Sequence, residues 1–296
     1  MIYDVKHVTR IRYSNPVRLA RFNLRLQPAT WAGQELTSYA LKVDPRPFQL
    51  QQEPGPFLVN RARVSLREPL DDITFESRFT VAVAPRPLPF PDPVGAPPPR
   101  VGEVAALVLG QHDVGPGAPA SYLYPSPVAG FVPEIAAWAR KLVGPEVDVF
   151  AAASLLMRTI HADFRYDPKA TRSDTPPLES FRKRRGVCQD FAHVMIVAAR
   201  ALAIPAAYVS GYLRTIAPPG QPRLVGADAM HAWVNVWCGP IAGWVGFDPT
   251  NNLLADEDHI FTAMGRDYSD VAPLDGVFHG DARQQMDVAV DVVPVS

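Results

Sequence analysis

Polar and apolar residues alternate along the first 84 positions, in short runs separated by proline, glycine and asparagine. The alternating runs are Tyr3 to Tyr13, Phe22 to Leu26, Tyr39 to Val43, Leu58 to Leu66 and Ile73 to Val83. Alternation predicts strands with one buried face, because successive side chains of a strand point to opposite sides. Asn15-Pro16 predicts a turn after the first run. We therefore expect residues 1–84 to form an antiparallel, sandwich-like β-domain.

The next stretch is rich in proline. Proline occupies every second position from Pro85 to Pro93, and three prolines follow at 97–99. Because proline fixes φ and lacks an amide hydrogen, these residues disfavour helix and sheet and predict an extended spacer. We interpret residues 85–120 as a linker, with a docking site for a proline-binding partner as the alternative.

Helical spacing of apolar residues begins after position 120, from Phe131 to Leu142 and from Phe150 to Ile160. An apolar run at 194–202 also has helical character, and strand-like runs follow at 206–213, 231–237 and 244–248. Gly239-Pro240 and Gly243 predict a hairpin between the last two runs. Helices followed by strands indicate an α+β domain over residues 121–296.

The composition narrows the class of protein. With 47% apolar and 20% charged residues, the 296-residue chain fits a globular protein with two domains. A net charge of −1 argues against a nucleic-acid or anionic-membrane surface. No run approaches the roughly 18 apolar residues of a membrane span, and the first residues lack a signal-peptide pattern. Two cysteines make no disulfide framework, so we expect a cytoplasmic location.

Three separated residues carry the candidate chemistry. Cys188 follows Gly186-Val187 where a helix is expected to begin, and the free N–H groups and dipole of a helix start favour a thiolate. His231 begins one strand of the predicted hairpin and Asp248 ends the other, so both should lie at the same end. Asp248 facing Nδ1 of His231 would fix the tautomer and stabilise the imidazolium. The three together predict cysteine-dependent acyl transfer.

Neighbouring polar residues have structural interpretations. His193 follows Cys188 by five positions, about 140° around a helix, and is expected to be a buried hydrogen-bonding residue. Asp190 lies in the first turn, where a carboxylate complements the helix dipole. Cys238 lies on the strand face opposite His231 and is expected to be an inert buried thiol.

A zinc site made of Cys188, His231, Asp248 and His259 is the alternative use of these residues. The four positions lack the paired spacing of zinc ligands, such as CxxC or HxxxH, so we do not favour this site.

Four ordered motifs resemble the transglutaminase-like superfamily, a branch of the papain-type cysteine enzymes. They are GVCQDFAH at 186–193, IPAAYVSGY at 204–212, MHAW at 230–233 and FDPT at 247–250. HVTRIRY at 7–13 and GRDYSDVAPL at 265–274 are similar to bacterial members that carry a β-domain before the core. The resemblance implies a papain-like core with helices packed on an antiparallel sheet.

The same resemblance assigns roles to residues. It implies Cys188 as nucleophile, His231 as base and Asp248 as orienting acid. It also makes Tyr166 a candidate oxyanion donor beside the backbone N–H of Cys188, with a core role as the equal alternative. It implies no metal and no other cofactor. The expected partner is a peptide, protein or other amide substrate, and assembly into a homo-oligomer is left open.

The reaction also has alternatives. Water resolving a thioester would give a peptidase or amidase, and an amine would give a transglutaminase. Because folds do not fix functions, a non-catalytic binding module that retains the fold is the competing hypothesis.

Overall fold

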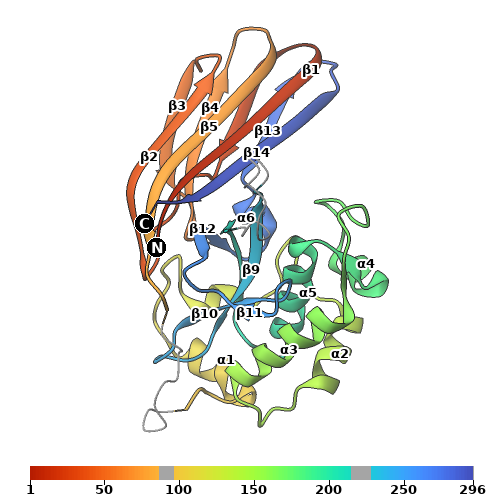
Figure 1. Ribbon diagram of the computed structural model, residues 1–296. Coiled ribbons are helices and arrows are strands. Elements are labelled where there is room, and N and C mark those ends of the chain that lie inside the picture. The colour runs from red at the N-terminus through yellow and green to blue at the C-terminus, as the bar shows by residue number, and fades with distance from the viewer. Residues whose placement is uncertain (87–96, 215–227, 296) are drawn as a thin grey trace, which may run out of the picture.

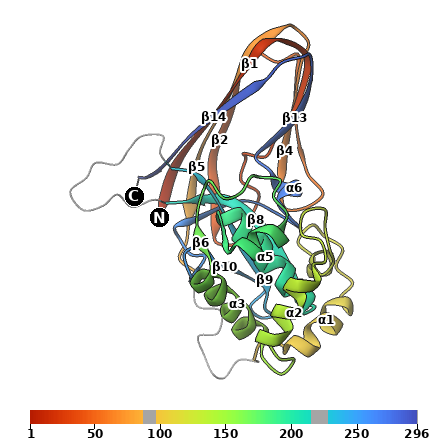
Figure 2. The same cartoon turned by 90° about the vertical axis from the view of Figure 1, so that its right-hand side faces the viewer.

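The computed structural model describes residues 1–86, 97–214 and 228–295, so most of the expected proline-rich spacer lies outside the described residues. A tall, curled β-sheet stands above a compact unit of helices and strands (Figure 1). The view turned by 90° shows the same two layers, with the helices gathered at the end away from the curled sheet (Figure 2). The α+β class, the antiparallel β-domain and the core of helices on an antiparallel sheet are confirmed.

The curled sheet has seven strands organised around the long first strand β1. The first part of β1 pairs with β5 and β14, and its last part pairs with β4 and β13, all antiparallel. Alternate side chains of β1 and β5 are buried, as the period-two pattern predicted. The strands are β1 (Ile2–Leu24), β2 (Gln34–Asp44), β3 (Gln49–Pro54), β4 (Asn60–Leu66), β5 (Leu70–Val83), β13 (Leu274–His279) and β14 (Gln284–Pro294).

The turn expected at Asn15-Pro16 is wrong. Strand β1 continues through these residues, and its register with β5 shifts between Arg12 and Val17. A proline is tolerated at such an irregularity because its missing N–H removes no ladder hydrogen bond there. Asn15-Pro16 therefore marks a bulge within one strand and not a turn between two strands.

The last two strands, β13 and β14, belong to the sheet of the N-terminal domain. The sequence had instead predicted that residues 121–296 form one cysteine catalytic domain. Eleven registered residue pairs, from Tyr3↔Pro294 to Tyr13↔Gln284, join β1 to β14. The chain thus leaves this sheet after β5, builds the core and returns. Helix α1 (Val101–Leu109) also lies inside the expected linker, and its buried residues join the core cluster. Alternation and spacing reveal an element but do not reveal which neighbour it pairs with.

The core contains a five-stranded antiparallel sheet in the order β11-β10-β9-β8-β12. One hydrophobic cluster joins helices α1, α2, α3 and α5 to strands β8, β9 and β10. The elements are η1 (Pro119–Tyr122), α2 (Pro133–Leu142), α3 (Val149–Asp163), β6 (Arg165–Tyr166), α4 (Pro177–Lys183), β7 (Arg185–Gly186), α5 (Cys188–Ala201), β8 (Ala206–Leu213), β9 (Met230–Trp237), β10 (Trp244–Asp248), β11 (Leu253–Leu254), β12 (His259–Gly265) and α6 (Tyr268–Val271). In the part of the chain that is described, no helix has the length and apolar character needed to cross a membrane.

The N-terminal sheet packs against the β8–β12 edge of the core. Tyr3, Val5 and Val290 share a buried cluster with Tyr212 of β8 and Ile260 of β12. Polar contacts complete the interface. The Gln34 amide bonds both the N–H and the C=O of Phe261, each at 2.8 Å. The Tyr3 hydroxyl donates to Asp258 Oδ1 at 2.7 Å.

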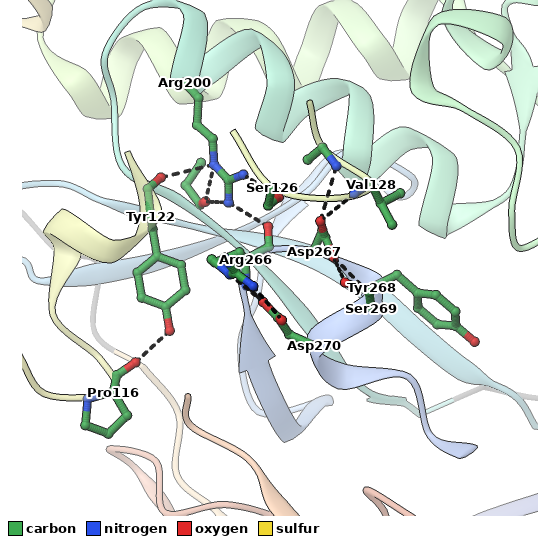
Figure 3. A network of polar contacts seen from close by, with 12 residues as sticks. Pro116, Tyr122, Ser126, Val128, Arg200, Arg266, Asp267, Tyr268, Ser269 and Asp270 are labelled. Atoms are coloured by element: carbon green, nitrogen blue, oxygen red, sulfur yellow. Dashed lines mark hydrogen bonds and ion pairs between the residues drawn. The ribbon is translucent and has the colours of Figure 1, made fainter. Parts of the chain in front are cut away.

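A buried arginine fixes the opposite end of β12. Arg200 of α5 donates to the carbonyl oxygens of Tyr122, Ala206 and Arg266 and to the Ser126 hydroxyl, all drawn in Figure 3. Next to Arg266, the fully buried Asp267 accepts the backbone N–H groups of Val128 and Ser269. Burying an unpaired charge is costly, so both buried side chains keep these hydrogen bonds. The bonds therefore fix the C-terminal end of β12.

The return of β14 predicts a contrast between two valines on the same strand. Val290 is 0% exposed and Val288 is 50% exposed. Val290→Ala should lower the free energy of unfolding by about 2 kcal/mol, because it leaves a cavity between the domains. Val288→Ala should change it by less than about 0.5 kcal/mol. Urea denaturation measures both, and equal losses would mean that β14 adds no core contacts.

Candidate active site

Cys188 is the first residue of α5 and is partly exposed. Asp190 Oδ2 holds the start of this helix by accepting the Val187 N–H at 2.8 Å and the Thr171 hydroxyl at 2.7 Å. Burial raises the pKa of Asp190 despite these two bonds. A Cβ at Gly186 would clash with the Asp190 carboxylate. The glycine before the cysteine is therefore required by close packing, and Asp190 has the structural role that we expected.

His231 and Asp248 lie at the same end of the hairpin, as predicted. Trp237 pairs with Trp244 and Val234 pairs with Phe247, so the start of β9 reaches the end of β10. His231 Nε2 lies 2.7 Å from Asp248 Oδ2. The expectation that Asp248 faces Nδ1 is wrong, because the side-chain rotamer, which alternation does not determine, turns Nε2 toward the carboxylate. Nδ1 is the nitrogen that remains available to Cys188, whose proximity helps to raise the pKa of His231.

The electrostatics favour a charged pair. Burial works against the imidazolium, but hydrogen bonds and charge from Asp248 and Cys188 raise the pKa of His231 to about 10. Burial also works against the Asp248 carboxylate, yet hydrogen bonds from His231, His259 and Asn251 hold its pKa well below the ordinary value. Since the His231 pKa is raised, the stability that the imidazolium contributes is fully present below about pH 6.5 and is lost as the pH rises through about 10.

The Asp248 carboxylate is fully buried and surrounded by donors. Oδ1 accepts the backbone N–H groups of Thr250 at 2.9 Å and Asn251 at 3.2 Å. Oδ2 accepts the Asn251 side-chain amide at 2.7 Å and faces His259 Nε2 at 3.2 Å, in addition to His231. A carboxylate with this many donors stays ionised and keeps one orientation.

The four residues of the zinc alternative do not surround one point. His231, Asp248 and His259 offer ligand atoms within 4.8 Å of one another. Cys188, however, contributes no ligand atom to this cluster. Hydrogen bonds to one another explain the positions of the remaining three residues.

The structure also places the other candidates. Tyr166 of β6 pairs in register with Gly186, is 56% exposed and has its pKa raised by burial and by the charge of Cys188. Cys238 is buried, which raises its pKa. His193 is buried and accepts the Tyr268 N–H at 3.2 Å. Burial lowers the His193 pKa to about 4, so this ring is neutral.

Sequence reasoning missed two residues that contact the candidate triad. Asn251 reaches the carboxylate from the turn after β10, three residues beyond Asp248. His259 entered only as a zinc ligand, although its hydrogen bond to Asp248 joins it to the site. A histidine at the start of the mostly apolar run of β12 was the available signal for His259.

Comparisons with known proteins give one family for both parts of the chain. The model of the transglutaminase-like superfamily matches residues 136–249, and that of the bacterial transglutaminase-like N-terminal region matches residues 3–82. An uncharacterized protein of Mycobacterium tuberculosis is 35% identical over 304 aligned positions, covering 99% of this chain and 92% of the relative.

Two further matches are less extensive in sequence. A protein-glutamine gamma-glutamyltransferase of Pseudomonas aeruginosa is 40% identical over 101 residues, which is 33% of this chain and 15% of that protein. A candidate cysteine protease of Cytophaga hutchinsonii matches in structure with a TM-score of 0.74 and 20% identity, covering 100% of this chain and 92% of that chain. At 20% identity, the match to the Cytophaga hutchinsonii structure shows a shared fold and nothing more.

The charged pair predicts that Cys188 reacts at low pH. An ordinary thiol is only about 0.3% ionised at pH 6, whereas a thiolate beside an imidazolium persists there. Iodoacetamide should therefore alkylate Cys188 at pH 6 within about tenfold of its rate at pH 8, while Cys238 stays slow because it is buried. Digestion and mass spectrometry separate the two sites.

Asp248→Asn supplies the matched variant, since it keeps the shape and removes the charge. Without that charge the imidazolium is less stable, and the rate at pH 6 should fall about tenfold or more. An ordinary thiol profile in the wild type, unchanged by the substitution, would contradict the ion pair.

Proposed function

Because this chain belongs to the transglutaminase-like superfamily, in its bacterial two-part form, we propose that it is a thiol-dependent amide hydrolase or acyl transferase. Cys188 is the nucleophile, His231 the base and Asp248 the orienting acid. The observation that carries the proposal is the hydrogen bond of 2.7 Å between His231 Nε2 and Asp248 Oδ2. The pKa of the same ring is also raised by the nearby Cys188. Covalent acyl transfer requires a nucleophile, a base that activates it and a third group that orients the base.

The first step forms the thioester. The Cys188 sulfur attacks the amide carbon, the carbonyl oxygen becomes an oxyanion, and the His231 imidazolium gives its Nδ1 proton to the leaving amine. The C–N bond then breaks and releases the amine. The backbone N–H of Cys188 and the Tyr166 hydroxyl are the proposed donors to the oxyanion.

The second step restores the thiolate. Neutral His231 takes a proton from an incoming water or amine, which attacks the thioester carbon and expels the sulfur. Throughout, the donors around Asp248 keep this residue ionised, so it stabilises the imidazolium without accepting its proton.

The acyl donor that we propose to test first is a glutamine side chain. The Pseudomonas aeruginosa relative is a protein-glutamine gamma-glutamyltransferase, and its match covers 33% of this chain and 15% of that protein. Hydrolysis and transfer share the thioester, so they differ only in what resolves it. The cytoplasmic location stays a prediction, and a reducing compartment would keep Cys188 active.

The second candidate is a binding module that retains the fold. The N-terminal sheet would then serve to dock a partner, and Cys188 would behave as an ordinary thiol. The retained Cys188, His231 and Asp248 favour the enzyme, because a scaffold has no need for a buried carboxylate aligned with a histidine.

Cys188→Ala should abolish turnover without unfolding the protein, since a partly exposed thiol at a helix start adds little to the core. Casein and a glutamine-containing peptide, each with dansylcadaverine, serve as substrates. Ammonia release with amine incorporation indicates transfer, ammonia alone indicates side-chain hydrolysis, and new amino termini indicate peptidase activity. Cys238→Ala is the matched control and should retain activity. Turnover by Cys188→Ala would refute the nucleophile assignment.

Tyr166→Phe tests the oxyanion donor. Loss of one donor to an oxyanion lowers kcat by about 10²–10³. Because the Tyr166 side chain is 56% exposed, thermal stability should not change. Alkylation of Cys188 at pH 6 involves no oxyanion and should remain as in the wild type. A kcat equal to the wild type would assign Tyr166 to a surface role.

A further inference from the structure

A third imidazole, His259, lies behind the catalytic carboxylate. It is the first residue of β12 and is only 3% exposed. Its Nε2 lies 3.2 Å from Asp248 Oδ2. Its Nδ1 accepts the backbone N–H of Asp256 at 3.4 Å. Since a backbone N–H can only donate, Nδ1 carries no proton, and in the neutral ring Nε2 carries the hydrogen that faces Asp248.

His259 differs from the other donors to Asp248 in the element of the fold that carries it. Asn251 and Thr250 belong to the turn that follows Asp248 and move with it. His231 is the group that Asp248 has to orient. Among the described residues that contact the carboxylate, His259 alone reaches it from a strand that β9 and β8 separate from β10. It therefore fixes Asp248 relative to the rest of the sheet.

The indole of Trp233 sets the distance between the two imidazoles. Trp233 is buried on β9, stacks on His231 at 6.2 Å between ring centroids and meets His259 edge-on at 5.1 Å. The titratable groups that face His259 are thus Asp248 and, across the indole, His231 at 6.1 Å. Both rings rest on one rigid surface, with the carboxylate between their Nε2 atoms.

Strand β12 is itself held on both sides of His259. Asp258, the preceding residue, accepts the Tyr3 hydroxyl of the N-terminal domain. Two residues after His259, Phe261 bonds the Gln34 amide twice and stacks on Trp31 at 4.4 Å between centroids. At the far end, the Arg200 network of Figure 3 binds the Arg266 carbonyl. The N-terminal domain thereby supports the strand that carries His259.

We propose that His259 is a positioning residue of the active site, whose Nε2–H holds the Asp248 carboxylate in line with His231. The inference rests on the proposed function. His259 touches neither the nucleophile nor the place of the reacting carbonyl, and it acts through Asp248 alone. The N-terminal domain takes part in the active site through the same strand.

Two substitutions separate hydrogen bonding from packing. His259→Phe keeps a ring against Trp233 and removes the donor, whereas His259→Gln keeps an N–H donor near the position of Nε2. The probe is iodoacetamide at pH 6, which reports the thiolate of Cys188 without any substrate. We expect the rate to fall about tenfold in His259→Phe, as for the loss of one hydrogen bond to a charged group, and to stay within about threefold of the wild type in His259→Gln.

The matched control is His7→Phe. His7 is another buried histidine, 2% exposed, whose Nδ1 lies 2.9 Å from the Tyr212 hydroxyl in the interface between the domains. Its loss should lower the melting temperature but leave alkylation at pH 6 unchanged. An equal fall in His259→Phe and His7→Phe would assign the effect to general loosening and overturn the inference.

Two other outcomes also overturn it. If Cys188 of His259→Phe is alkylated at pH 6 as fast as in the wild type, Asp248 needs no such support. If the alkylation rate of His259→Gln falls as far as that of His259→Phe, packing is the cause. A wild type without low-pH alkylation would instead refute the proposed function. Should His259→Phe fail to fold, ¹H–¹⁵N correlation spectra of the wild type decide the question. The inference requires a neutral His259 protonated at Nε2, and the opposite tautomer refutes it.

Discussion

The buried ion pair between His231 and Asp248 is the constraint on which the rest of the core depends. A carboxylate with no solvent exposure is unfavourable unless donors replace its water. Here the turn after β10 supplies backbone and amide N–H groups, and the two histidines supply the rest. The hairpin, the Trp233 indole and the position of β12 are all arranged so that these donors meet one side chain. The imidazolium that results is the partner that a reactive thiolate needs.

Helix α5 and the sheet contribute separate parts of the same arrangement. The helix brings Cys188 to its own N-terminal turn, where Asp190 and the close contact at Gly186 hold the backbone. The sheet brings the charged pair to one end of β9 and β10. The helix packs on β8 and β9 through a shared hydrophobic cluster, which fixes the helix start that carries Cys188 relative to the strand that carries His231. Precision at the site comes from core packing, which tolerates little movement.

Much of this was readable from the sequence, because local rules govern it. The strands at 206–213 and 244–248 and the helix at 149–163 follow from period and turn residues. The shared end of His231 and Asp248 follows from the hairpin. Which nitrogen faces Asp248 did not follow, since a rotamer depends on tertiary contacts. His259 was considered only within the zinc alternative that we did not favour, because its partner lies across the sheet. Asn15-Pro16 predicted a turn where tertiary pairing keeps one long strand with a bulge.

The pairing of β1 with β14 has a consequence for biosynthesis. Tyr3 and its strand partner Pro294 lie near opposite ends of the described chain, so Tyr3 leaves the ribosome long before Pro294. Until then β1 has an open edge, and open edges are sites of aberrant association. The helices and inner strands of the core, whose contacts lie closer in sequence, can assemble earlier, because local contacts form before distant ones. The core that carries the candidate site would thus assemble first, and the sheet that braces β12 would be completed only after β14 has been synthesised.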